Sequence, residues 1–173
     1  MSKQFSFAQI FLWLFVIMLG IMIGGGLYEQ LVVMPLWQSA PPDSVIAYYQ
    51  HNLANPQHTL NQGGRFWAIV APLVSLLAIA TLISGFRTRS EHRKWRIAGT
   101  VLTLIIMVFT AVWFIPNIIK LQGEGVMAMN ADEVTSLTNW WVSLNWVRAI
   151  LYLAAWLAAL RALSIPPKAE NNI

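Results

Sequence analysis

The sequence predicts an all-α protein, an antiparallel four-helix transmembrane bundle that forms one domain over residues 1–173. Hydrophobic residues make up 57% of the chain and charged residues only 10%, whereas about a quarter of the residues in a soluble domain are charged. The apolar residues gather in four long stretches that contain almost no charges. Each stretch is long enough to cross the roughly 30 Å hydrocarbon layer of a bilayer as a helix.

The ends of these stretches set the expected boundaries. We expect helices over residues 5–36, 64–86, 96–120 and 131–164, a basic loop over 87–96, and outer loops over 37–63 and 121–138. In the first outer loop, Asp43 or Ser44 is a typical helix cap, so a short helix is expected on the membrane surface. Asn130 is the expected cap of the last helix, which therefore begins outside the membrane.

The charges of the loops predict the orientation. The connection between the second and third helices has five basic residues against one acidic residue, a net charge of +4, whereas the connection after the third helix has one basic against three acidic residues, a net charge of −2. By the positive-inside rule the basic loop and both termini are cytoplasmic. The expected location is the cell membrane, the inner membrane in a bacterium. Only Trp95 could stack on a base in this short loop, which argues against nucleic-acid binding.

Two charges lie inside the apolar stretches. Arg148 is about 12 Å beyond Trp140 along the last helix, where an arginine costs about 2.5 to 3.5 kcal/mol even on lenient insertion scales. Glu29 lies about 9 Å before Pro35 on the first helix. Because the two helices run in opposite directions, both charges reach one depth, and we expect them to pair.

Asparagine and aromatic side chains extend this polar layer. Trp141, Asn145, Arg148 and Tyr152 follow one another at spacings of four, three and four, which places them on one face of the last helix. Asn117 shares a face of the third helix with Trp113. The alternative interpretations are structural: the two charges only neutralise each other, and Asn117 caps a helix beside Pro116.

Other chemistries have no support in the sequence. There is no cysteine, so a disulfide and a thiolate metal site are excluded. His51 and His58 lack a third ligand at metal-binding spacing, so no metal site is expected. His58 is instead expected to fold over the outer mouth of the bundle. No motif for an organic cofactor is present.

Three short motifs resemble the anthrone-oxygenase-like membrane proteins, a four-helix family whose members mostly have no assigned activity. They are the run from Gly25 to Glu29, the Ile-Pro-Asn that ends at Asn117, and the Asn-Trp-Val-Arg that ends at Arg148. The resemblance implies oxidation of anthrones to anthraquinones without a tightly bound metal or flavin. The chain departs from the family pattern at Ile118 and Ile119, where an asparagine or a basic residue is usual.

These observations lead to two hypotheses. In the first, an outward-facing site takes a small aromatic or quinone-like molecule and oxidises it without a cofactor. Its catalytic residues would be Glu29 as base, with Arg148, Asn145 and Asn117. Its substrate-binding residues would be Tyr28, Trp113, Trp141, Tyr152 and His58.

In the second hypothesis the protein is a non-enzymatic membrane scaffold or assembly subunit, and the charge pair is structural. A transporter is less consistent with the chain, because no inverted repeat is visible. The expected partners are the lipid bilayer, a small aromatic ligand, and further copies of the chain in a homo-oligomer.

Overall fold

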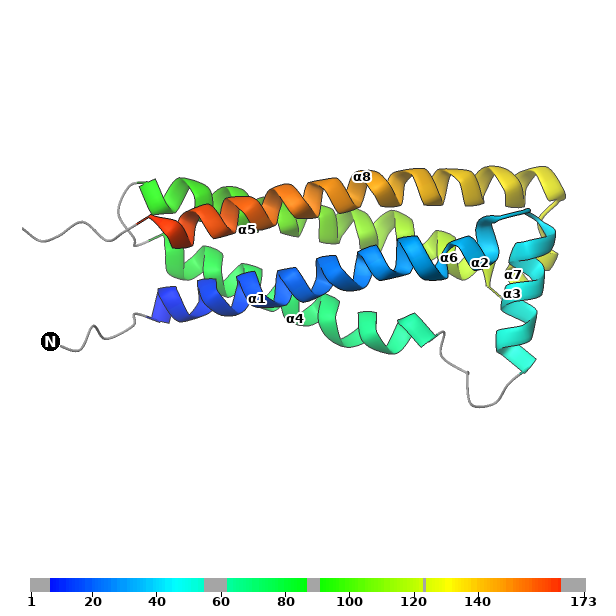
Figure 1. Cartoon of the computed structure of the whole chain (residues 1–173), viewed down its shortest axis with the longest axis horizontal. Helices are drawn as coiled ribbons and strands as arrows, with labels where there is room; N and C mark the ends of the chain where they lie inside the picture. The colour runs from blue at the N-terminus through cyan, green and yellow to red at the C-terminus, as the bar shows by residue number, and fades with distance from the viewer. Residues whose placement is uncertain (1–6, 55–61, 87–90, 123, 166–173) are drawn as a thin grey trace, which may run out of the picture.

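The computed structural model describes residues 7–54, 62–86, 91–122 and 124–165, which are helical almost throughout (Figure 1). The elements, in chain order, are α1 (Phe7–Tyr28), the π-helical turn η1 (Glu29–Val33), α2 (Pro35–Gln38), α3 (Asp43–Ala54), α4 (Gln62–Gly85), α5 (Glu91–Phe109), the π-helical turn η3 (Thr110–Phe114), α6 (Ile115–Leu121), α7 (Glu124–Met127) and α8 (Ala131–Ser164). This confirms the predicted all-α fold.

Four continuous helical rods are long and apolar enough to cross a membrane. They cover Phe7–Gln38, Gly63–Gly85, His92–Leu121 and Ala131–Ser164. Large apolar side chains such as Ile69, Val112 and Ile150 are 64–72% exposed on their outer faces. Surfaces of this kind are stable in lipid and not in water. The chain is therefore an integral membrane protein.

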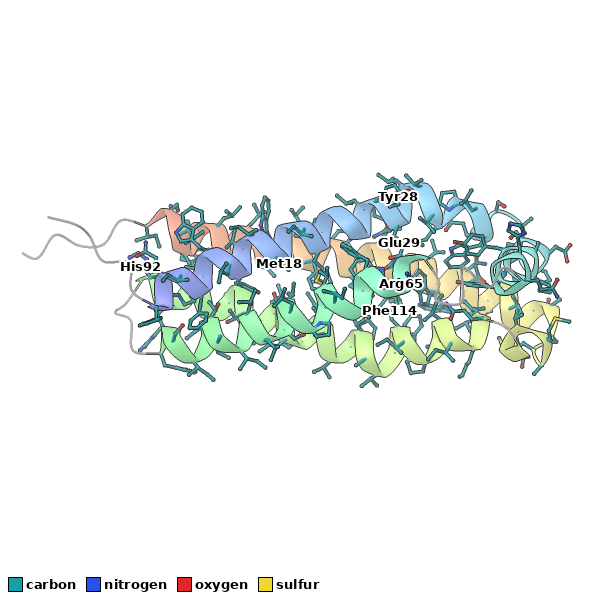
Figure 2. The ribbon with its side chains drawn as sticks, turned by 90° about the horizontal axis from the view of Figure 1, so that it is seen from below. Met18, Tyr28, Glu29, Arg65, His92 and Phe114 are labelled. Carbon is teal, nitrogen blue, oxygen red and sulfur yellow. The ribbon has the colours of Figure 1, made fainter. Side chains whose placement is uncertain are left out.

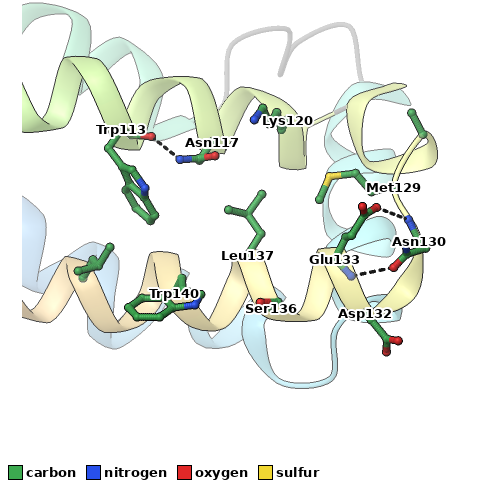
Figure 3. Close-up of a pocket in the computed structure, with 12 residues that line it drawn as sticks. Trp113, Asn117, Lys120, Met129, Asn130, Asp132, Glu133, Ser136, Leu137 and Trp140 are labelled. Atoms are coloured by element: carbon green, nitrogen blue, oxygen red, sulfur yellow. Dashed lines mark hydrogen bonds between the residues drawn. The ribbon is translucent and has the colours of Figure 1, made fainter.

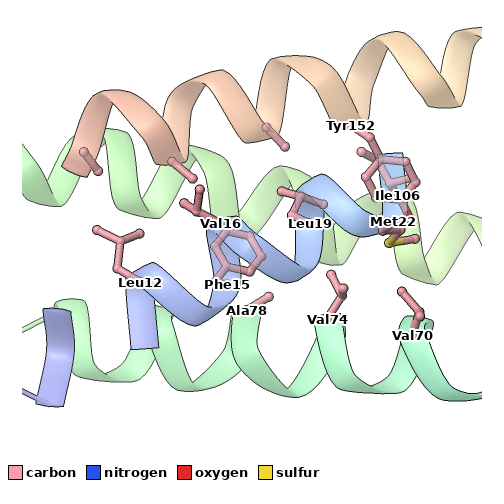
Figure 4. Packing of buried hydrophobic residues seen from close by; sticks show 13 residues of the cluster. Leu12, Phe15, Val16, Leu19, Met22, Val70, Val74, Ala78, Ile106 and Tyr152 are labelled. Carbon is pink, nitrogen blue, oxygen red and sulfur yellow. The ribbon is translucent and has the colours of Figure 1, made fainter. Parts of the chain in front are cut away.

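The rods pack in a ring, in which α1 contacts α4 and α8, and α5 contacts α4 and α8. Buried residues on α1 recur at spacings of three and four, from Leu12 to Met22, and form the main core with side chains from α4, α5 and α8 (Figure 4). The residues that α8 buries in this half are mostly alanines. Small side chains allow close contact between helix backbones, and Gly99 of α5 faces the backbone of α8 at Ala155.

Two π-helical turns interrupt two rods near the end of the bundle that carries α3, and each precedes a proline. In η1 the N–H of Met34 donates to the carbonyl of Glu29 at 2.8 Å, and Pro35 follows. In η3 the N–H of Ile115 donates to the carbonyl of Thr110, and Pro116 follows. A proline has no N–H for the regular ladder and crowds the carbonyl one turn back, so a widened turn relieves the clash.

The end of the bundle that carries α3 is closed by a second core. The short helix α3 lies across this end (Figure 1) and buries Val45 and Tyr49 against Trp37 of α2. Burial raises the pKa of the Tyr49 hydroxyl, which also forms a hydrogen bond with Gln122. The Ser44 hydroxyl donates to the carbonyl of Trp37 at 2.7 Å and accepts from Ala40. It therefore ties α3 back to α2.

Asn130 caps α8, as the sequence predicted. Its side chain accepts a hydrogen bond from the N–H of Glu133 at 2.9 Å, and the Glu133 carboxylate accepts one from the N–H of Asn130 at 2.9 Å.

We expect Asn130→Ala to lower the free energy of unfolding by about 1 kcal/mol, because the amide of Glu133 loses its partner. Unfolding in detergent micelles at increasing sodium dodecyl sulfate concentration would measure this, with the exposed Asn139→Ala as control. An unchanged midpoint would contradict the role of the cap.

Candidate functional site

The two charges of the apolar stretches come together near the π-helical turns. Glu29 is the first residue of η1 and lies within the bundle, whereas Tyr28 lies at its outer face and is 62% exposed (Figure 2). The guanidinium of Arg148 on α8 attracts the Glu29 carboxylate, and the side chain of Trp67 on α4 forms a hydrogen bond with that carboxylate. Three rods therefore meet at Glu29.

Arg148 also has an aromatic partner. Its Cζ atom lies 4.2 Å from the centroid of the Phe114 ring, within the range of a cation–π interaction. Phe114 is 2% exposed and ends the widened turn η3. The two π-helical turns thus supply one partner each, since η1 supplies Glu29 and η3 supplies Phe114.

A small cavity lies beside Arg148. Its volume is about 20 Å³, and its lining residues are Met22, Ile23, Gly26, Gln30, Trp67, Asn145, Arg148, Ala149 and Tyr152. A volume of this size holds about one water molecule. In this conformation the cavity therefore has room for one hydroxyl-sized group and not for a planar ring system.

Gln30 and Asn145, which we call the amide pair, face this cavity and are 5% and 2% exposed. The Gln30 Nε2 atom donates to the backbone carbonyl of Asn145 at 3.3 Å, and the Asn145 Nδ2 atom donates to the Met34 Sδ atom at 3.2 Å. The two amide oxygens, Gln30 Oε1 and Asn145 Oδ1, have no hydrogen-bond partner in the described part of the chain. Buried amide oxygens normally accept a hydrogen bond.

Tyr152 completes the wall of the cavity one turn beyond Arg148. It is 4% exposed. Its hydroxyl donates to the Met107 Sδ atom at 3.5 Å and forms a hydrogen bond with Thr110. The orientation of Tyr152 is therefore fixed by Met107 of α5 and by Thr110 of η3.

Trp141 lies outside the cavity in an aromatic cluster. Its ring packs edge-on against Trp37 and Phe114, with ring centroids 5.5 Å apart in both cases. The side chain is 4% exposed. Because neighbouring rings enclose it, Trp141 in this conformation supports the shape of the site and has no free face for a ligand.

Asn117 and Trp113 lie in a different place, a wide groove between α6 and α8 at the α3 end (Figure 3). The groove has a volume of about 1050 Å³ and also contains Trp140, Leu137 and Lys120. The Asn117 Nδ2 atom donates to the carbonyl of Trp113 at 2.7 Å. The polar layer that the sequence predicted is therefore divided between the cavity and the groove.

The structure places the predicted site residues in four groups. Asn145, Arg148 and Tyr152 line the cavity and Glu29 lies within electrostatic range of Arg148, Asn117 and Trp113 line the groove, Trp141 is enclosed, and Tyr28 faces outward. His58 lies outside the described residues. Within the described ranges no group of three His, Asp or Glu side chains could hold a metal ion.

Sequence reasoning missed Gln30, Trp67 and Phe114. Gln30 follows Glu29 directly, and on a regular helix it would point about 100° away from it. The signal that could have found Gln30 and Phe114 was Pro35 and Pro116, which each follow a π-helical turn. Trp67 lies on α4, and no such signal marks it. A widened turn changes which side chains face the bundle, and such turns occur often at functional sites.

Comparison with known families supplies an independent result. No curated protein and no solved structure matches the chain. A model of the family described as anthrone oxygenase matches residues 58–158, more than half of the 173 residues. The match includes Asn145 and Arg148, whereas Glu29 and Gln30 precede it. This chain belongs to the anthrone oxygenase family.

Proposed function

We propose that this protein oxidises a flat aromatic molecule with molecular oxygen, at a site between the first and last rods. The family description supports this reaction class. The observation that carries the proposal is the position of Arg148 and the amide pair around one cavity inside the bundle, with Glu29 within electrostatic range of Arg148. Ionisable groups at this depth are costly, and in membrane proteins they usually mark a functional pathway or site.

In the proposed reaction the substrate is an anthrone-like ring system with an activated methylene group. Glu29 takes a proton from the methylene, and Arg148 stabilises the enolate oxygen. The enolate passes electrons to O₂ one at a time, and a carbon–oxygen bond forms. The resulting peroxide anion takes the proton back from Glu29.

The hydroperoxide then loses water, because the second methylene C–H bond and the O–O bond both break. A carbonyl group remains on the carbon. In sum, one CH₂ group and one O₂ molecule give one C=O group and one H₂O molecule. The protein's contributions are the base, the charge that holds the enolate, and a site from which bulk water is excluded.

The size of the cavity sets a requirement for this reaction. A ring system needs more than the 20 Å³ beside Arg148, so the cavity has to widen when the substrate binds. Ile23, Trp67 and Ala149 are half-buried and border the cavity. Met22 is flexible, and Gly26 has only the Trp67 ring, at 3.9 Å, near the position of a Cβ atom. We therefore expect the wall that α1 and α4 form to move when the substrate binds.

The orientation follows from the loop charges. We propose that the basic end of the bundle, with both termini, lies in the cytoplasm and that the α3 end faces outward. Glu29 and Arg148 then lie in the outer half of the bilayer. In a bacterial cell this membrane would be the inner membrane.

The proposed orientation is tested by labelling single cysteines, introduced at Ser2 and Asp43, with a membrane-impermeant reagent. Only the cysteine at position 43 should react in intact cells.

The reaction is tested by following oxidation of anthrone under air. We expect Glu29→Gln and Arg148→Met each to lower the rate per folded protein about 100-fold, the scale of a lost general base or oxyanion partner. The double variant should be equally slow. Asp132→Asn and Arg161→Met are the matched controls, because they make similar changes at exposed positions of α8. Equal rates in all of these proteins would exclude the catalytic proposal.

The alternative function is a non-enzymatic scaffold, in which Glu29 and Arg148 hold the rods together. One observation favours it: each charge already has a partner, Trp67 for Glu29 and Phe114 for Arg148. A scaffold predicts full cellular function for the double variant, in which neither charge remains. The enzyme predicts a folded but inactive protein.

A further inference from the structure

We propose that the amide pair forms a site for a hydroxyl donor, which distinguishes the reduced, hydroxyl-bearing form of an aromatic ligand from its oxidised, carbonyl-bearing form. The inference rests on the proposed function for the identity of the ligand, and on the cavity for its chemistry.

The cavity contains two hydrogen-bond acceptors that have no donor. Each NH₂ group of the amide pair donates one hydrogen bond, that of Gln30 to a backbone carbonyl and that of Asn145 to Met34. The oxygens Oε1 of Gln30 and Oδ1 of Asn145 are buried and have no partner among the described residues. An amide oxygen can only accept, so these two positions require a ligand group that donates.

The charge in the cavity complements these acceptors. Arg148 contributes N–H donors to the same wall, and an arginine can only donate. A hydroxyl group both donates and accepts, so it can donate to an amide oxygen while it accepts from Arg148. A carbonyl oxygen accepts only. It could bind Arg148, but it would leave both amide oxygens unpaired, which is unfavourable in a buried site.

The volume of the cavity agrees with this assignment. About 20 Å³ accommodates one water molecule or one hydroxyl group, while the ring that bears the hydroxyl lies against the half-buried residues of the border, Ile23 and Trp67. Water is the occupant when no ligand is bound. The enol form of the substrate carries this hydroxyl donor, whereas the oxidised product has only carbonyl oxygens there, so the product then binds less tightly than the enol.

Binding is tested without oxygen, so that no oxidation occurs. The probes are 2-naphthol and 2-methoxynaphthalene, which differ in the donor at the same oxygen, with 1,4-naphthoquinone as the carbonyl-only ligand. Dissociation constants are measured by calorimetry in detergent micelles under nitrogen. We expect the parent protein to prefer the naphthol over the methoxy compound by about tenfold, the effect of one to two hydrogen bonds. The quinone should bind no better than the methoxy compound.

Variants of Gln30 and Asn145 test whether these two residues cause the preference for the naphthol. Gln30→Met and Asn145→Leu should each reduce the naphthol preference below about threefold, and binding of the methoxy compound shows that each variant is folded. Gln38→Met is the matched control, because the Oε1 atom of Gln38 is also buried without a partner but lies outside the cavity. It should keep the full preference. Comparing each ratio with that of the parent cancels unequal partitioning of the two probes into micelles.

Two results would overturn the inference: no preference for the naphthol in the parent, or the same preference in Gln30→Met and Asn145→Leu as in the parent. Both are independent of catalysis. A naphthol preference without anthrone oxidation would refute the proposed function and leave the donor site standing. Anthrone oxidation without the preference would do the reverse.

Discussion

Glu29→Gln is expected to lower the free energy of unfolding by about 3 to 5 kcal/mol, the usual cost of leaving a buried charge without its partner. The substitution keeps the shape of the side chain and removes the attraction of the carboxylate for Arg148. An arginine does not lose its proton in a protein, so its charge remains inside the bundle. The measurement is unfolding in mixed micelles at increasing sodium dodecyl sulfate concentration.

The double variant with Arg148→Met is expected to recover most of this loss, because no charge is then left at this depth. The side chain of methionine can still pack on Phe114, although the cation–π interaction at 4.2 Å is lost. Additive losses in the two single variants and the double variant would mean that the two charges do not stabilise each other. In that case the attraction between Glu29 and Arg148 would contribute nothing measurable to the free energy of unfolding.

Gly99→Ala is expected to lower the free energy of unfolding by about 2 to 3 kcal/mol, at the upper end of the usual cost of overpacking. A Cβ atom at position 99 would lie 2.8 Å from the backbone oxygen of Ala155 and 3.2 Å from the backbone nitrogen of Ala159. These are main-chain atoms of α8, which cannot rotate away as the end of a side chain can. The helices α5 and α8 would have to separate.

Gly24→Ala is the matched control for this prediction. No atom of the described residues lies within 4 Å of the position that its Cβ atom would take. The variant should therefore be as stable as the parent or more stable by about 0.5 to 1 kcal/mol, because alanine restricts the unfolded chain. Both variants would be compared by thermal unfolding in the same micelles. Equal stability of Gly99→Ala and Gly24→Ala would show that the α5 and α8 backbones are not in close contact.

Much of the fold follows from composition and periodicity. The four spanning helices are visible because hydrocarbon forces every backbone polar group to bond within its own segment, so long apolar runs have only one available structure. The short helix α3 and the Asn130 cap follow from local turn chemistry. The family resemblance, carried by motifs that end at Asn117 and Arg148, agrees with the family match over residues 58–158.

The site was only partly predictable. Depth counting places Glu29 and Arg148 at one level, and in the structure the two charges lie within electrostatic range of each other. Asn117 was assigned to the same layer because it has a similar depth, yet it lines the groove between α6 and α8. Depth along a helix can be counted from the sequence, whereas the direction of a side chain around the axis depends on the widened turn η3 and on which helices are neighbours.

The sequence by itself determined that four apolar helices cross a membrane, that two opposite charges lie within them, and that the chain resembles one family. Only the tertiary structure decided that Gln30 faces Asn145, that Phe114 lies under Arg148, and that the shared cavity has the size of one hydroxyl group. Hydrophobicity acts on each segment independently and can be read locally. Packing depends on the rotation of each helix against its neighbours, which no single segment encodes.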